Sequence, residues 1–82
     1  MFKFKRDKDW DKPFSRKIAK RVSKIATADL PLWADQAIYE TSRLLTAYER
    51  ERTPQAMAEL TDGAEAVHAL VWELSRRSRK LF

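Results

Sequence analysis

The sequence of 82 residues contains no cysteine and only one histidine. Without cysteine the chain has no disulfide, zinc–thiolate site or thiol nucleophile, and a lone histidine is too little for a catalytic dyad or triad. The chain also lacks any run that approaches the roughly 20 apolar residues of a membrane-spanning helix. Its basic start is not followed by the apolar core of a signal peptide. We therefore predict an intracellular, cytoplasmic protein that is not an enzyme.

Positive and negative charges are concentrated in different parts of the chain. Residues 1–28 contain ten Lys or Arg and three Asp, whereas residues 29–75 contain three Arg and nine Asp or Glu. Residues 76–82 add four cations, so both ends are basic, the middle is mildly acidic and the whole chain carries +5. Such asymmetry bears on the partners of a protein rather than on its fold.

A pattern of apolar and small residues predicts two antiparallel helices in a defined register. Five pairs of positions have numbers that sum to 105: Tyr48 with Met57, Leu45 with Leu60, Thr41 with Ala64, Ile38 with Val67, and Ala34 with Val71. Successive members are three or four residues apart, which is the rhythm of a packed helical seam, and a constant sum arises when two helices of equal rise run antiparallel. The turn should centre on Arg52 and Thr53, with Thr53 capping the helix that Pro54 opens.

The periodicity predicts three helices, over residues 13–28, 32–51 and 54–80. The first is the most clearly amphipathic, because its apolar residues share one arc of the helical wheel and five cations occupy the opposite arc. Asp29 is expected to cap the second helix. Gly63 interrupts the third at a cost of roughly 1 kcal/mol relative to alanine, so we expect another helix to approach closely there.

The apolar arcs of the second and third helices are wider than a single seam requires, so further apolar surface must be covered. The first helix has a matching face and a short linker, which is usual in helical bundles. We therefore predict an all-α three-helix bundle built on an antiparallel helical hairpin, with Ile18 and Val22 in the core. Residues 13–82 would form this single domain, after a basic N-terminal arm over residues 1–12. Association into a homodimer is the other way to cover the remaining surface.

One short motif, Glu65-Ala-Val-His68, has the Glu-x-x-His spacing found in di-iron four-helix bundles. Ligands in such bundles must face inward, but Glu65 lies roughly 140° from the apolar stripe of its helix on a wheel of 100° per residue. We therefore predict no metal site, no cofactor and no catalytic residue.

The cations point instead to a partner-binding surface. In an up-down-up bundle the C-terminal ends of the first and third helices meet at one pole, and the cations there exceed what the helix macrodipole favours. The predicted partner-binding residues are Lys20, Arg21, Lys24, Trp33, Trp72, Arg76, Arg77, Arg79 and Lys80. Tryptophans beside a basic cluster suit an interaction patch, or else they close the end of a small core. Because the C-terminal arginines follow the last expected core residue, Leu74, reversing their charge should leave the fold intact.

Several partners fit this surface. A protein with an acidic surface is our first choice for a small interaction or accessory protein. An anionic membrane is the second, since residues 13–28 resemble an interfacial helix, with Phe2, Phe4 and Trp10 upstream as anchors; this would place the protein at the inner face of the membrane. Nucleic acid is the third, although no nucleic-acid-binding motif is present. The basic face is otherwise simply the solvated side of a bundle helix.

Two stretches carry a resemblance, Asp29-Leu-Pro-Leu-Trp-Ala-Asp-Gln-Ala37 and Gly63-Ala-Glu-Ala-Val-His-Ala-Leu-Val71. They resemble short uncharacterised helical proteins of actinobacteria and their phages, over about two thirds of the chain. The resemblance implies a small bacterial or phage accessory protein and transfers no activity to any residue.

Overall fold

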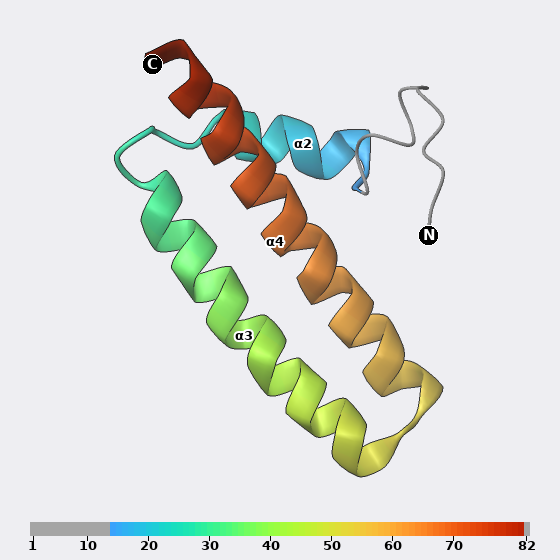
Figure 1. Cartoon of the computed structure of the whole chain (residues 1–82). Helices are drawn as coiled ribbons and strands as arrows, with labels where there is room; N and C mark the ends of the chain where they lie inside the picture. Colours follow the sequence, from blue (N-terminus) through green and yellow to red (C-terminus); the bar gives the residue numbers. More distant parts are fainter. Residues whose placement is uncertain (1–13, 82) are drawn as a thin grey trace, which may run out of the picture.

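The computed structural model describes the backbone of residues 14–81 and the side chains of residues 14–79. Within them three helices follow one another: α2 (Arg16–Ser23), α3 (Leu30–Glu51) and α4 (Pro54–Leu81) (Figure 1). This part of the chain contains no strand, so the prediction of an all-α three-helix bundle on an antiparallel hairpin is confirmed. The predicted arm over residues 1–12 lies outside the described residues.

Helix α2 is shorter than the predicted helix over residues 13–28. It begins after Ser15, whose hydroxyl accepts a hydrogen bond from the Ile18 backbone N–H at 3.3 Å, and it ends at the C-cap Lys24. Because the chain must turn into α3 by Leu30, the residues expected to form the last helical turn form the connecting turns instead.

The turn between α3 and α4 lies where the sequence predicts it. Arg52 ends α3 in the left-handed region, with φ of 50°, and its N–H donates to the Tyr48 carbonyl at 2.7 Å. The Arg52 guanidinium also lies 5.9 Å from the centre of the Tyr48 ring. The Thr53 hydroxyl accepts from the Ala56 N–H at 3.0 Å and caps α4, as predicted. At the other end of α3, Asp29 is the N-cap by position, but its side chain makes no capping hydrogen bond.

Helices α3 and α4 approach closely at Gly63, as predicted. A Cβ atom at this position would lie 2.8 Å from Thr41 Oγ1 and 3.1 Å from Leu44 Cδ1. Thr41 cannot easily move away, because its hydroxyl donates to the Ala37 carbonyl at 2.7 Å. The absence of a side chain therefore lets α3 pack directly on the backbone of α4.

The predicted register has the right level, but only part of its stripe is buried: Ala34 lies in the core and Thr41 lies against Gly63. The residues expected opposite one another, such as Ile38 and Val67, line one groove between the helices. That groove is open, however, and Ile38 remains 48% exposed. The buried contact is rotated towards Gly63 and Leu70, because only the side without a Cβ allows the close approach.

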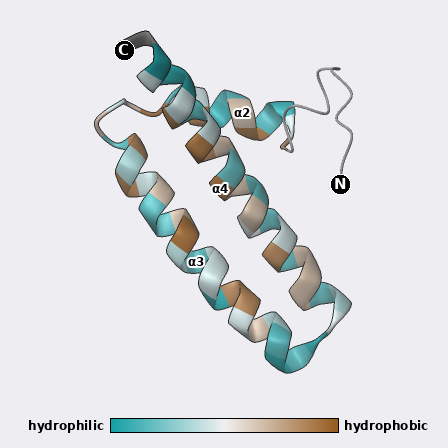
Figure 2. Ribbon diagram, viewed as in Figure 1, coloured by the Kyte–Doolittle hydropathy of each residue, from teal (hydrophilic) through white to brown (hydrophobic). Residues whose placement is uncertain are grey.

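The core gathers at the end of the hairpin that α2 crosses (Figure 1). Five buried residues form it, and half-buried residues pack around them. The buried five are Val22, Leu30, Ala34, Ala69 and Leu70. Figure 2 shows hydrophobic positions recurring along much of α3 and α4, beyond this end. The core therefore uses only part of the apolar surface that the hairpin offers.

Helix α2 packs on α4, and its backbone does not approach that of α3. The first helix therefore covers only part of the excess apolar surface, through Val22, which shares the core with residues of both α3 and α4. An eight-residue helix is about 12 Å long, too short to run beside helices of 22 and 28 residues. It lies against the C-terminal half of α4, between Glu65 and Arg77, and leaves the rest of the hairpin open (Figure 1).

Candidate functional site

The apolar side of α2 is used for packing against α4. Val22 is 6% exposed and lies in the core, and Ile18 and Phe14 are half-buried beside it. The prediction that Ile18 and Val22 are core residues is thus confirmed for Val22 and in part for Ile18. The same surface is therefore not free to enter a lipid layer while the bundle is intact.

The opposite side of α2 is a continuous basic face. We call its five residues the α2 basic face: Arg16, Lys17, Lys20, Arg21 and Lys24, all exposed. Helix α2 contains no acidic residue, and none of the ion pairs between residues 14 and 79 engages these five cations. Because a two-turn helix is only about 12 Å long, five positive charges are concentrated on one short surface.

Helix α4 holds α2 at both ends with polar contacts. At its N-terminus, Glu65 Oε2 accepts a hydrogen bond from the Ser15 N–H at 2.7 Å. At its C-terminus, Arg77 Nη2 donates to the Ser23 carbonyl at 3.2 Å and Arg77 Nη1 donates to Thr27 Oγ1 at 2.9 Å. A negative group at the N-terminus of a helix and a positive group at its C-terminus both stabilise the helix, because each interacts favourably with the helix macrodipole. The orientation of the α2 basic face is therefore set by two side chains of α4.

A buried carboxylate organises the arginines of the pole. Glu73 is 3% exposed. Arg76 donates to it through Nε at 3.2 Å and Nη2 at 2.7 Å, and Arg77 donates through Nε at 2.7 Å. The hydrogen bond from Arg76, together with that from Arg77, holds the pKa of Glu73 below its ordinary value of 4.5, although burial opposes the shift. The same hydrogen bond, which Arg76 donates to Glu73, raises the pKa of Arg76.

The pairing with Glu73 corrects the sequence analysis at two predicted site residues. Arg77 has only 17% of its side chain exposed and belongs to the α2–α4 contact, and Arg76 is engaged by the same carboxylate. Both were expected to lie beyond the packed part of the chain, which is wrong for Arg77, whereas Arg76 keeps 39% of its side chain exposed. The i, i+3 and i, i+4 spacing of Glu73 with the two arginines is the sequence signal that could have revealed the pairing.

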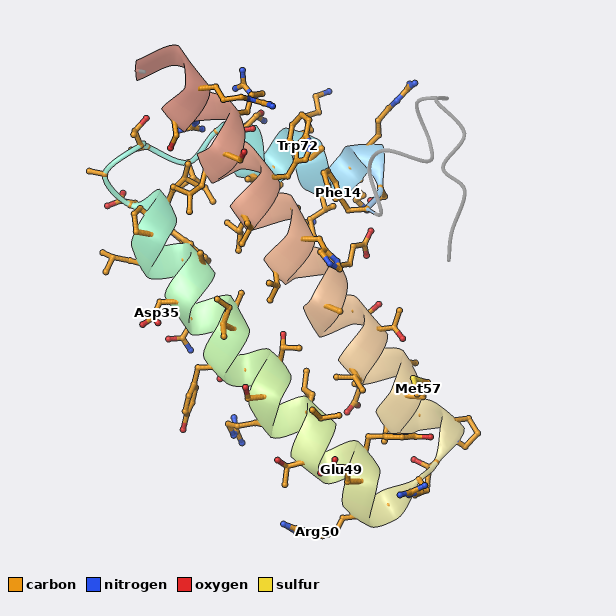
Figure 3. All side chains as sticks on the ribbon, in the orientation of Figure 1. Phe14, Asp35, Glu49, Arg50, Met57 and Trp72 are labelled. Carbon is orange, nitrogen blue, oxygen red and sulfur yellow. The ribbon has the colours of Figure 1, made fainter. Side chains whose placement is uncertain are left out.

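The two predicted tryptophans lie in different surroundings. Trp72 is half-buried and makes an edge-to-face contact with Phe14, with ring centres 5.8 Å apart and planes at 63° (Figure 3). Trp33 on α3 is 55% exposed. The sequence left two roles open for these tryptophans, closing the end of the core or contacting a partner. The position of Trp72 fits the first role, whereas the exposed Trp33 is available for the second. Arg79 is exposed near the end of α4, whereas the side chain of Lys80 lies outside the described residues.

The remaining candidates carry no reactive arrangement. Among the described residues no group of three or more His, Asp or Glu side chains is placed to hold a metal ion, and Glu65 is occupied by its contact with Ser15. Within the same part of the chain, no helix combines the length and apolar character needed to cross a membrane. Comparison of the chain with family models, curated proteins and solved structures found no match.

Proposed function

We propose that this protein is a small, non-enzymatic interaction protein that binds a protein partner with an acidic surface through the α2 basic face. The observation that supports the proposal is the contrast between two groups of cations. Arg76 and Arg77 are matched by Glu73, but the five cations of α2 have no acidic partner among the described residues. Trp33 and Arg79 are both exposed, and they would make secondary contacts with the same partner.

The geometry favours a folded acidic partner over a lipid surface. An interfacial helix must bury its apolar face in the membrane, but Val22 on that face is already buried against α4. Membrane binding through α2 would therefore require breaking the contacts of Glu65 and Arg77 at its two ends. A protein surface needs only the side of α2 that already faces outward.

The charge distribution favours, as the binding partner, a protein with a compact acidic patch over a nucleic acid. Residues 29–75 carry a net charge of −6, so the hairpin beside α2 repels an extended polyanion. Nucleic-acid affinity depends on neutralising many phosphates along a strand, whereas the α2 basic face spans only about 12 Å. A short acidic segment can meet this face without approaching the acidic hairpin. We further propose that the protein acts in the cytoplasm as an accessory protein.

Binding of immobilised protein to three probes tests this proposal: a short polyglutamate peptide that matches the length of the α2 basic face, phosphatidylserine vesicles, and duplex DNA. We expect polyglutamate to bind most tightly, with an affinity that falls as salt increases, because exposed charges are screened beyond about 8 Å at physiological ionic strength. The double variant Lys20→Glu/Arg21→Glu should lose this binding. The matched variant Arg43→Glu/Arg50→Glu, which reverses two exposed cations of α3, should retain it.

Either of two results would refute the proposal. One is preferential retention of vesicles or DNA over polyglutamate at the same salt. The other is equal loss of polyglutamate binding in the α2 variant and the α3 variant, since the effect would then follow net charge and not the α2 basic face.

A further inference from the structure

The side of the hairpin that α2 leaves open contains an apolar groove of about 260 Å³. Helix α3 contributes Ile38, Thr41 and Leu45, and helix α4 contributes Leu60, Ala64 and Val67. No residue of α2 lines it. The remaining lining residues are Ser42 and His68, so no Asp, Glu, Lys or Arg lines the groove.

The apolar surface extends beyond the groove in both directions along α4. Met57, near the interhelical turn, is 41% exposed (Figure 3), and Val71, towards the other end, is 45% exposed. On α3, Ile38 and Leu45 are 48% and 46% exposed. Met57, Ala64 and Val71 are spaced by seven residues, as are Ile38 and Leu45, and this heptad spacing is the pattern of a helical packing seam. We call the surface formed by these residues and the groove the open face.

The composition of the open face is that of an interface. Charged residues make up 35% of the chain, yet none lines the groove. Depletion of charge at the centre of a surface, with polar residues around it, distinguishes protein interfaces from ordinary surface. Isolated exposed apolar residues are normal, but a continuous stripe along two helices indicates a binding surface.

The open face is large enough to form a specific interface with the same face of a second copy. The shorter helix, α3, has 22 residues and is about 33 Å long, so a face two helices wide covers roughly 650 Å². Two such faces together bury roughly 1,300 Å², within the range of specific interfaces. A single foreign helix, about 10 Å across, would cover only half of this width.

The small core gives an independent reason for association. Six hydrophobic residues are buried among the described residues, and three of them are alanines: Ala34, Ala56 and Ala69. A core this small leaves a domain marginally stable on its own, and association is one of the usual remedies. We propose that two copies of this chain pack their open faces together around a two-fold axis, forming a four-helix bundle with the two α2 helices on the outside.

The proposed dimer leaves the α2 basic face exposed in both copies, so it is independent of the function proposed above. Its contacts are apolar, and the hydrophobic effect is strengthened rather than screened by salts such as sulfate. The dimer should therefore persist under the salt conditions that weaken binding to an acidic probe. This difference separates failure of one proposal from failure of the other.

Sedimentation equilibrium of the full chain over a wide range of concentration tests the dimer. We expect twice the chain mass, falling to the chain mass on dilution, with a thermal midpoint that rises with protein concentration. Leu45→Glu should weaken dimerisation by roughly a hundredfold or more, because it places an unpaired charge in a desolvated interface. Its helical circular dichroism should remain, since Leu45 is half exposed in the single chain. The matched control Leu32→Glu, at a 68% exposed position outside the open face, should dimerise like the wild type.

Val71→Glu repeats the test from the other helix, and it decides the outcome if Leu45→Glu does not fold. A wild-type chain that keeps the chain mass at every concentration overturns the proposal. So does a dimer that Leu45→Glu and Val71→Glu leave intact, or one that Leu32→Glu disrupts to the same extent.

Discussion

The side chain of Arg77 joins the buried carboxylate of Glu73, at 2.7 Å, to the C-terminal end of α2. One guanidinium thus serves two purposes: it neutralises a carboxylate that has lost its water, and it satisfies the carbonyl of Ser23 at the end of a short helix. Removing it would take this donor from the Ser23 carbonyl and leave Glu73 with Arg76 alone. The orientation of the α2 basic face therefore depends on an arginine that does not itself belong to that face.

This relationship predicts that reversing Arg77 and reversing Arg79 have different consequences for folding. Arg77→Glu places a second carboxylate against Glu73 and should lower the free energy of unfolding by about 3 kcal/mol, as expected when a buried ion pair is broken. Arg79→Glu changes an exposed residue and should alter it by less than about 0.5 kcal/mol. Urea unfolding followed by circular dichroism measures both, and equal effects of the two substitutions would contradict the assigned role of Arg77.

The lowered pKa of Glu73 predicts acid sensitivity. A carboxyl group whose pKa is lower in the folded state than in the unfolded state stabilises the fold at pH values above its unfolded pKa, here 4.5. That contribution is lost as the pH falls below 4.5 through the lower folded pKa. Glu73→Gln should therefore flatten the fall in unfolding free energy below this pH. The exposed control Glu59→Gln should leave the slope unchanged, and an unaltered slope in Glu73→Gln would contradict the prediction.

Because of the close approach at Gly63, we expect the residue at position 41 to decide whether Gly63→Ala stabilises or destabilises the protein. Gly63→Ala gains roughly 1 kcal/mol of helix propensity but forces its Cβ against Thr41 Oγ1, which a hydrogen bond to Ala37 holds in place. Overpacking of this kind costs about 1–3 kcal/mol, so the single variant should be destabilised. In a Thr41→Ala background the same substitution should stabilise the protein.

A double-mutant cycle on Gly63 and Thr41 by thermal or urea unfolding measures this coupling. Additive effects of the two substitutions would show that the two residues do not limit the approach of α3 to α4. The cycle needs no assumption about the dimer, provided that all four variants are compared at one low protein concentration.

The sequence predicts the hairpin well because the information for it is local or periodic. The 3–4 rhythm sets the level of Ile38 against Val67, and the cap at Thr53 and the turn at Arg52 depend on neighbouring residues. Periodicity cannot tell which side of the stripe packs inward when both sides are apolar. That choice depends on the missing side chain at Gly63 and on the position of α2.

The site was harder to predict because its decisive contacts join residues about 50 positions apart. Ser15 meets Glu65, and Ser23 and Thr27 meet Arg77, and no local pattern marks such pairs. Sequence alone identified the five cations of α2 as one face. The i, i+4 spacing of Glu73 and Arg77 marks their pairing, but no local pattern marks the contacts of Arg77 with Ser23 and Thr27.

The two tryptophans of the predicted site should respond in opposite ways to truncation. Trp72 packs against Phe14 between α2 and α4, so Trp72→Ala should lower the free energy of unfolding by about 2 kcal/mol, less than the loss for a fully buried ring. Trp33 is 55% exposed, and Trp33→Ala should change stability by less than about 0.5 kcal/mol. If Trp33 contacts the acidic partner, its removal should instead speed dissociation of bound polyglutamate, because anchoring aromatic residues act mainly on the dissociation rate. Stopped-flow dissociation and urea unfolding of the same two variants measure both quantities. A large stability loss in Trp33→Ala, or none in Trp72→Ala, would contradict the division of roles between the two rings.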